Sequence, residues 1–574
     1  MPQDAFTLRH LTAELDKIFA GGTINRITVP DGDTVIFTVY NGKGTEKLLI
    51  SANPSSPRIA VFSGEEISPL TAPNFCMLLR KHLIGAKIVK IELSGFDRIV
   101  KITCFYKGEF SDGEEKTIYA ELMGRYSNVI LTANGKVLGS NRGVNFFDNG
   151  IRPLITGKDY IFPPTQNKFL PNDRNLIEKF KNIGANVPEF IFNNVTGLAL
   201  STAEEIARSF ALKIGAGSEE VSLIVQKDPE SFFDFLNEFI YSERIKPCIE
   251  EENGEYKDVF AFPYATVSGN IKYFDNLYLA ENEFYDKKQA LKRFKEKKDG
   301  LLHSAESAKK KIKKRLSTLY ARKADADSAE ENRLKGELII SNIYKLKYGD
   351  EKLVAENYYD GGKEITIPLD KSLSPADNAE RYFKKYNKQK RTLFALEPFI
   401  KQAESEYEYL QSLVDFISIA ESEDDLIALY SEAEKYGLIK PQNIRKKKEQ
   451  NKPFRQYDIF GYEVKVGRSN IENDELVYSA ADSDIWLHSK SYRSAHVIIK
   501  AGGKEVPEKV LISAAEICAY YSKCRDGKSE IVYTKRINLK KPKGAKFGLW
   551  NYSDYNSITV ESSPHEEDRR SPDR

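Results

Sequence analysis

The chain has 574 residues and a formal net charge of +2; 41% of its residues are hydrophobic and 30% are charged. This length is too great for one hydrophobic core and predicts about three or four domains, and the composition is that of a soluble globular protein. The five cysteines form no CxxC pair, the N-terminus lacks the apolar run of a signal peptide, and no apolar run approaches the length of about 18 residues that a membrane helix needs. We therefore expect no disulfide framework, metal, cofactor, secretion or membrane span, and a cytoplasmic location.

The first predicted domain, residues 1–172, is rich in strands. Between about 24 and 165, short runs of β-branched and aromatic residues alternate with turn sequences such as PDGD and NGKG. Helical patterns cover 7–20 and 72–84. This order predicts an α+β domain with antiparallel sheets, which closes at a pair of prolines in GKDYIFPP.

Short helices are predicted at 173–245, and a β-rich connector is predicted at 246–282. The segment PEFIFNNVTGLALSTAEEIARSF contains a helix, a TGL turn, a small polar cap at Ser201 or Thr202, and a second helix. This is the order of a helix-hairpin-helix. Such hairpins commonly grip a nucleic-acid backbone, and a plain packing role fits the same residues equally well.

Residues 283–440 predict an antiparallel coiled coil, with long helices at 283–346 and 375–436 and a small tip at about 347–374. The two arms differ in charge. Residues 287–323 contain 15 Lys or Arg against 3 Asp or Glu, and residues 401–435 contain 2 against 10. Either the arms neutralise each other as a solvated coiled coil, or the basic arm faces a polyanion.

A basic linker at 441–454 leads to a final α+β domain at 455–562 and a disordered tail at 563–574. In the segment YTKRINLKKPKGAKFGLWNY, aromatic residues stand between basic ones, and no acidic residue occurs from 534 to 546. Phosphate neutralisation combined with stacking on aromatic rings predicts binding of single-stranded or loop RNA, and a solvated basic loop is the alternative. The basic residues are Lys535, Arg536, Lys540, Lys541, Lys543 and Lys546.

The segment DIWLHSKSYRSAHVII, residues 484–499, has two histidines eight positions apart. A metal or catalytic site would need further ligands or an oriented nucleophile, and Asp484 is the only nearby candidate. We instead expect Trp486 and 497–499 to be core residues. The polar residues around them are then expected to project from the connecting loop toward RNA. These are His488, Lys490, Arg493 and His496.

Motifs along the whole chain match one known family in order. They are FCMLLRKHLIGAKI, GFDRIV and ELMGRYSNVIL in the first domain, GELIISNIYKLKYG and LSPADNAERYFKKYNK in the coiled coil, and VGRSNIENDELVYSAADSDIWLHSKSYRSAHVII and KKPKGAKFG in the last domain. On these motifs the chain resembles the NFACT family, and most closely its bacterial ribosome quality control members. The resemblance implies a multidomain α+β fold. Its parts are an NFACT-N domain similar to the N-domain of formamidopyrimidine-DNA glycosylases, a helix-hairpin-helix domain, the coiled coil and an NFACT-R domain.

The resemblance also implies a function. Family members bind a large ribosomal subunit that still holds peptidyl-tRNA, recruit tRNA, in bacteria alanyl-tRNA, and extend the stalled nascent chain with alanine, which marks it for degradation. The ribosome forms the peptide bonds, so we expect a tRNA-recruiting factor and no enzyme. A small S4-like RNA-binding protein is a further partner that the resemblance implies.

The family's tRNA-binding pair corresponds to Asp97 and Arg98, which follow the strand-like AKIVKIEL and a turn at Gly95. The planar guanidinium group of Arg98 can bind a phosphate or a base edge, and Asp97 can orient Arg98 or accept a hydrogen bond from a base amine. On the residues alone, a structural salt bridge is the alternative. Asp4 lies where the family has a further tRNA-linked Asp, although Ala5 replaces the usual glycine.

The sequence departs from the family at residues 493–495, where Arg-Ser-Ala replaces the usual Pro-Gly-Ser.

Two other functions have some support. A glycosylase would use Pro2 as an amine nucleophile, but Gln3 stands where such enzymes have an acid, and their zinc finger is absent. A surface adhesin that binds fibronectin follows from an older family name, and no signal peptide or anchor supports it.

Overall fold

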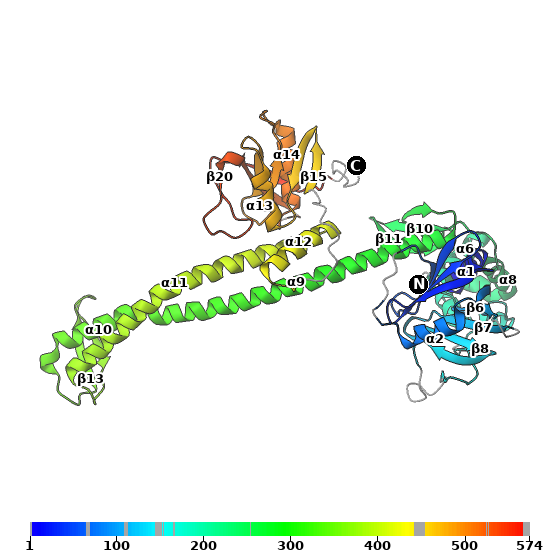
Figure 1. Ribbon diagram of the computed structural model, residues 1–574, viewed down its shortest axis with the longest axis horizontal. Helices are drawn as coiled ribbons and strands as arrows, with labels where there is room; N and C mark the ends of the chain where they lie inside the picture. The colour runs from blue at the N-terminus through cyan, green and yellow to red at the C-terminus, as the bar shows by residue number, and fades with distance from the viewer. Residues whose placement is uncertain are drawn as a thin grey trace. The chain divides into compact units, whose positions relative to one another are not determined.

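The computed structural model describes residues 3–440 and 454–565, apart from short stretches at 65–68, 70, 108–112, 144–151, 153, 165–166, 218, 253, 524 and 526. Residues 441–453 of the predicted linker (441–454) and 566–574 of the predicted tail (563–574) lie outside the described residues. The chain divides into two compact units, Met1–Leu291 and Lys292–Arg574 (Figure 1). In the part of the chain that the structure describes, no helix has both the length and the apolar character needed to cross a membrane.

The first unit is built on an antiparallel sheet, as the alternation of strands and turns predicts. Its strand order, within the described residues, is β4-β3-β2-β1-β5-β6-β7-β8-β9. β-Branched and aromatic residues favour these strands because they pack well on a half-buried pleated surface. The strands are β1 (Thr23–Thr28), β2 (Thr34–Tyr40), β3 (Thr45–Ser51), β4 (Arg58–Val61), β5 (Lys87–Leu93), β6 (Ile99–Tyr106), β7 (Glu114–Glu121), β8 (Asn128–Ala133) and β9 (Lys136–Ser140).

Helices α1 (Ala5–Phe19) and α2 (Asn74–Leu83) pack on this sheet. In α1, buried Leu8, Leu11, Leu15 and Phe19 recur every three or four residues and form one apolar face. Full burial of each such side chain stabilises the fold by about 1.5–3 kcal/mol. This helix therefore holds Asp4, the residue that precedes it, in a fixed position.

The helices that follow share the core of the sheet. Phe180, Ile206 and Phe232 belong to the same buried cluster as Phe6 of α1, although the sequence predicts a separate domain at 173–245. The helices are α4 (Asn175–Phe180), α5 (Val187–Asn194), α6 (Leu200–Ile214), α7 (Val221–Lys227) and α8 (Pro229–Ile240). A small sheet with the order β11-β10-β12 comes next, from β10 (Cys248–Glu252), β11 (Glu255–Phe260) and β12 (Asn270–Tyr273).

Two long helices run side by side (Figure 1): α9 (Leu277–Asp327), most of which belongs to the second unit, and α11 (Pro375–Ile419). Leu319 of α9 packs against Leu396 and Ile400 of α11. The predicted long helices are each interrupted, because α10 (Ala329–Ser341) and α12 (Glu423–Tyr436) are separate helices. A capping box of Ser422 and Asp425 begins α12. The tip contains the hairpin of β13 (Lys352–Asn357) and β14 (Lys363–Pro368).

The C-terminal domain has an antiparallel sheet with the order β15-β16-β18-β17-β19-β22. Its core is shared with the base of the coiled coil, because Tyr457 and Leu487 lie in one buried cluster with Leu413 and Ile417 of α11. The elements are β15 (Arg455–Ile459), β16 (Tyr462–Val466), α13 (Asn470–Ser479), β17 (Ile485–Ser489), β18 (Val497–Ile499), α14 (Glu508–Tyr520), β19 (Lys528–Lys535), β20 (Leu539–Lys540), β21 (Asn551–Tyr552) and β22 (Asn556–Glu561). The predicted multidomain α+β class is thus confirmed.

Candidate nucleic-acid interface

The predicted tRNA-binding pair lies on the turn between β5 and β6. Gly95 has a φ of 65°, a left-handed conformation that glycine adopts without steric cost. The N–H of Ser94 donates to the carbonyl of Ile99 at 2.8 Å and closes the hairpin. The carboxylate of Asp97 accepts from the N–H of Arg98 at 2.7 Å. Both side chains are half-buried at the surface.

Asp4 is almost completely buried, with 1% of its surface exposed. It is the N-cap of α1, because its Oδ1 accepts from the N–H of Thr7 at 2.9 Å. Its Oδ2 accepts from the N–H of Ala199 at 3.0 Å and from the hydroxyl of Thr202 at 2.7 Å. One carboxylate therefore joins the first turns of α1 and α6, which lie far apart in sequence.

The predicted cap of α6 at Ser201 or Thr202 is wrong. The helix begins at Leu200 and its N-cap is Ala199, whose side chain has no oxygen. Asp4 supplies the missing acceptor from another part of the chain. Gly197 makes this approach feasible: at a φ of 79°, a Cβ on it would lie 2.5 Å from Ala5 Cβ and 2.5 Å from the carbonyl oxygen of Phe96.

A pocket of about 440 Å³ brings the three predicted tRNA-binding residues together. Asp4, Asp97 and Arg98 line it with Lys168 and the first turn of α6. Burial lowers the pKa of Lys168, and the neighbouring Arg98 charge lowers it further, while Asp97 opposes the change. The other lining residues, several of them apolar, are Met123, Pro164, Phe192, Thr196, Gly197, Leu198, Ala199 and Leu200.

The groups around this pocket suit a nucleotide. Arg98 and Lys168 favour an anion such as phosphate, whereas the first turn of α6 is already capped by the carboxylate of Asp4. Asp97 offers an acceptor to a base amine. Sequence reasoning missed Lys168 and Phe192, because they come from segments without a recognisable motif. Lys168 is held in place by donation to the carbonyl of Phe192 at 2.6 Å.

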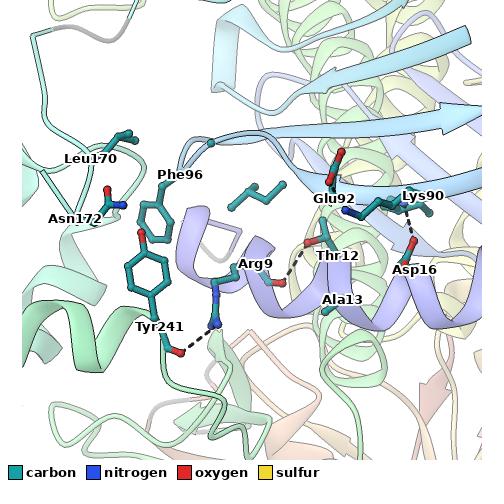
Figure 2. A pocket seen from close by; sticks show the side chains of 13 residues that line it. Arg9, Thr12, Ala13, Asp16, Lys90, Glu92, Phe96, Leu170, Asn172 and Tyr241 are labelled. Carbon is teal, nitrogen blue, oxygen red and sulfur yellow. Dashed lines mark hydrogen bonds and ion pairs between the residues drawn. The ribbon is translucent and has the colours of Figure 1, made fainter.

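A second pocket, of about 510 Å³, adjoins the same turn and is lined by Gly95 and Phe96 (Figure 2). Arg9 is fixed in it by the carbonyls of Ser242 at 3.0 Å and Tyr241 at 3.1 Å. Its guanidinium carbon lies 5.6 Å from the centre of the Tyr241 ring. The turn that carries Asp97 and Arg98 therefore lines both pockets, with Gly95 and Phe96 in one and Asp97 and Arg98 in the other.

The histidines of the C-terminal domain are placed differently from the prediction that they project from a loop. His488 lies on β17 and stacks on Trp486, with ring centres 5.6 Å apart, and only 2% of His496 is exposed. Burial lowers the pKa of His488 to about 4 and also lowers that of His496. Neutral rings within an aromatic cluster give no positive charge to phosphate. Trp486 and 497–499 are buried, as predicted.

Two further residues of this segment are paired within the protein. Lys490 forms an ion pair with Glu530 at 2.7 Å. Arg493, which stands where the resemblance leads us to expect proline, pairs with Glu408 and with Asp415 at 3.4 Å, both on α11. The expectation that Arg493 projects toward RNA therefore needs correction, because this side chain lies against the acidic helix.

Asp484 has a structural role. Its Oδ1 accepts from the N–H of Ala501 at 3.0 Å, and its Oδ2 accepts from the N–H of Ala481 at 2.9 Å and the ammonium of Lys500 at 2.9 Å. Among the described residues, no group of three or more His, Cys, Asp or Glu side chains is placed to hold a metal ion.

The basic loop after β19 divides into paired and exposed residues. Arg536 pairs with Asp482 at 3.1 Å, and Lys541 pairs with Asp474, which also accepts from the indole N–H of Trp550 at 2.8 Å. The side chains exposed to solvent are those of Lys535, Lys540 and Lys543. Lys546 is half-buried. These four residues keep their charge available for a phosphate backbone, within the described part of this domain.

The basic arm of the coiled coil is only partly neutralised. Arg315 lies 3.6 Å from Glu406, and Lys297 lies 2.8 Å from Glu423. A run of exposed lysines on α9 makes no ion pair with any described carboxylate: Lys310, Lys311, Lys313 and Lys314. Neutralisation by the acidic arm therefore applies to part of this helix, and the interpretation that the basic arm faces a polyanion stays a prediction for its exposed lysines.

The residues of the glycosylase alternative lie near the start of the chain. Pro2 lies outside the described residues. Gln3 is buried, where its side-chain amide donates to the carbonyl of Ile59 at 3.0 Å and to Glu281 at 3.1 Å. Burial raises the pKa of Glu281 to about 8, so this carboxyl group is mostly neutral at pH 7. Gln3 thus has a packing role.

Comparison with known proteins covers nearly the whole chain. A family model described as NFACT N-terminal and middle domains matches residues 4–452, and one described as NFACT protein RNA binding domain matches residues 453–549. The chain is 32% identical to the Rqc2 homolog RqcH of Bacillus subtilis over 563 residues, 96% of each chain. It is 25% identical to the archaeal Rqc2 homolog aRqcH of Methanocaldococcus jannaschii, over 89% of this chain and 79% of that protein. A solved structure of the N-terminal part of the fibronectin/fibrinogen-binding protein from Streptococcus suis is 26% identical, covers 50% of this chain and 99% of its own, and has a TM-score of 0.42.

Proposed function

The chain belongs to the NFACT family, and from this premise we propose that it is a ribosome quality control factor that recruits tRNA to stalled large ribosomal subunits. It binds subunits that carry peptidyl-tRNA, brings alanyl-tRNA to them, and supports addition of alanine to the nascent chain without a template. The peptide bonds are formed by the ribosome, so the chain itself acts as a binding factor in the cytoplasm. Its similarity to relatives named RqcH supports this role.

The observation that carries the proposal is the pocket that joins Asp4, Asp97 and Arg98. The three residues are predicted to bind tRNA from separate stretches of sequence, and they line one hollow together with Lys168. Arg98 and Lys168 offer positive charge to a backbone phosphate, and Asp97 offers an acceptor to a base edge. The exposed lysines of α9 and of the C-terminal domain supply the salt-dependent affinity that binding to ribosomal RNA requires.

The proposal is tested by changing Asp97 and Arg98 together to alanine in the full chain. Both side chains are half-buried at a turn, so the variant is expected to fold. It should co-sediment with large subunits as the original chain does, but lose at least about 90% of the tRNA that co-purifies, because a charge-assisted contact contributes about 1.5–3 kcal/mol. Sequencing of the co-purified tRNA reports whether alanine isoacceptors dominate.

A matched control is the double replacement of Asp173 and Arg174 by alanine, an adjacent Asp-Arg pair in the same unit that does not line the pocket. This control should keep both tRNA and subunit binding. If the variant with Asp97 and Arg98 replaced recovers as much tRNA as the original chain, the assignment of the site is contradicted. Absence of the unchanged chain from large-subunit fractions at low salt would contradict the proposed function as a whole.

A further inference from the structure

A pocket of about 480 Å³ lies where the basic loop of the C-terminal domain meets the base of the coiled coil. Its walls come from three elements: α11, α12, and the loop between β20 and β21. The lining residues are Glu406, Tyr409, Lys435, Tyr436, Lys546 and Phe547. Its volume falls within the range of about 300–1,000 Å³ that small-ligand sites occupy. Neither the sequence motifs nor the family comparison assigns a role to Tyr436.

The aromatic wall is held in position by buried groups. The ring of Tyr436 packs on that of Tyr409, with centres 4.8 Å apart and planes 30° apart. Tyr409 is itself fixed, because its hydroxyl donates to Glu432 at 2.7 Å, and Glu432 also accepts from Asn470 at 2.9 Å. Phe547 lies on the loop between β20 and β21, and 48% of its surface is exposed. The pocket thus has one positioned ring and one exposed ring.

The charge of the pocket is positive. Its acidic residue, Glu406, forms an ion pair with Arg315 at 3.6 Å and accepts a hydrogen bond from the side-chain amide of Gln402 at 3.0 Å. Lys435 and Lys546 form no ion pair with any carboxylate of the described chain. The ammonium group of Lys546 lies 5.4 Å from the centre of the Tyr436 ring. The pocket therefore combines two lysines with exposed aromatic surface, and one of the two ammonium groups lies over the Tyr436 ring.

We propose that this pocket binds one unpaired nucleotide of an RNA strand. The base stacks against Phe547 and the Tyr436 ring, and the flexible stems of Lys435 and Lys546 bring their ammonium groups to the flanking phosphates. A paired base cannot enter, because both of its faces are covered in a helix; the site selects single-stranded or looped RNA. This inference rests on the proposed function. It implies that the C-terminal domain and the coiled coil both contribute residues to the RNA site.

The test measures binding of the full chain to a fluorescein-labelled single-stranded RNA of twelve nucleotides by fluorescence anisotropy. Replacing Phe547 by alanine should weaken binding by about 5- to 150-fold, the range found when one aromatic ring that stacks on a base is removed. Replacing Lys435 and Lys546 by alanine should lower the slope of log affinity against log salt by about 0.7 for each phosphate that is no longer neutralised. The Phe547→Ala variant should keep the original slope. The Phe547→Tyr variant should bind like the original chain.

The matched control is Phe460→Ala. Phe460 is 62% exposed in the same domain and has Lys509 4.2 Å from its ring centre, but it lines no part of this pocket. It should bind the RNA within twofold of the original chain. Photocrosslinking of RNA that contains 5-iodouridine should join the RNA to Phe547 or Tyr436. The inference is overturned if Phe547→Ala binds as tightly as Phe460→Ala, or if the unchanged chain does not bind the RNA. Sedimentation of Phe547→Ala with large subunits is scored separately and reports on the proposed function.

Discussion

Replacing Asp4 by alanine should loosen the first turns of α1 and α6 together. The change removes the N-cap acceptor of Thr7, which costs about 1 kcal/mol. It also leaves the N–H of Ala199 without its acceptor, at a cost of about 1–3 kcal/mol for a buried donor. Thr202 is affected less, because its hydroxyl lies 3.2 Å from that of Tyr264 and keeps this partner. The expected local loss of stability is therefore about 2–4 kcal/mol.

Hydrogen exchange of the full chain, followed peptide by peptide, measures this loss where it occurs. At about 1.4 kcal/mol for each factor of ten, amides in the first turns of both helices should exchange about 30- to 700-fold faster. Asp16→Ala is the control, since Asp16 lies on the same helix, about three turns beyond Asp4, and accepts from the N–H of Ile91 at 2.7 Å. Exchange within threefold of the original chain at both helices would refute the structural role of Asp4. Loss of tRNA together with unchanged exchange would instead indicate direct contact.

Two further predictions concern the C-terminal domain. The folded pKa of His488 is lowered to about 4, whereas an unfolded histidine titrates near 6.5, so the unfolded chain binds the proton first. The contribution of His488 to stability should be fully present above about pH 6.5 and should be lost as the pH falls toward 4. The midpoint of urea unfolding should therefore fall less steeply with pH in His488→Phe than in the original chain. If both midpoints fall equally, the loss of stability comes from another group. Asp425 and Arg455 form a fully buried ion pair at 2.8 Å, so Asp425→Ala should cost about 3–5 kcal/mol and lower the midpoint of thermal unfolding by at least about 6 °C. Lys490→Ala, which removes one partner of an exposed pair, should leave that midpoint nearly unchanged, and equal effects of the two variants would contradict the argument.

Local features of the candidate site could be predicted from sequence. The strand-like AKIVKIEL and the glycine at 95 predict a strand followed by a turn, and β5 and the left-handed Gly95 confirm this. The side chains of Asp97 and Arg98 lie on that turn, as expected. Periodicity and turn chemistry act over a few residues, and the hairpin depends on nothing more distant.

Contacts between distant segments could not be predicted in the same way. Asp4 accepts hydrogen bonds from residues 199 and 202, and nothing in the residues around α6 indicates that its cap comes from the start of the chain. Thr202 is a reasonable choice of cap by composition, but its hydroxyl donates to Asp4 instead of accepting from its own helix.

The histidine segment shows a different limit. The prediction for this segment assumes that the polar residues around a buried tryptophan point outward. His488 instead stacks on Trp486 on the same strand, and His496 meets the indole edge-on with ring centres 5.3 Å apart. A neutral imidazole packs in an aromatic cluster much as another ring does. Composition does not reveal which of these two environments a histidine occupies.

The core that α11 shares with the C-terminal sheet has a consequence during synthesis of the chain. Leu413 and Ile417 leave the ribosome before Tyr457 and Leu487, the residues that cover them in the finished protein. Until the last strands emerge, residues of α9 and α12 cover only part of the apolar face at the base of the coiled coil, and the rest is a site for aggregation or chaperone binding. A chain cut short before β15 would keep that part of the face permanently exposed, so this protein would itself become a poorly folded product if its own translation stalled there.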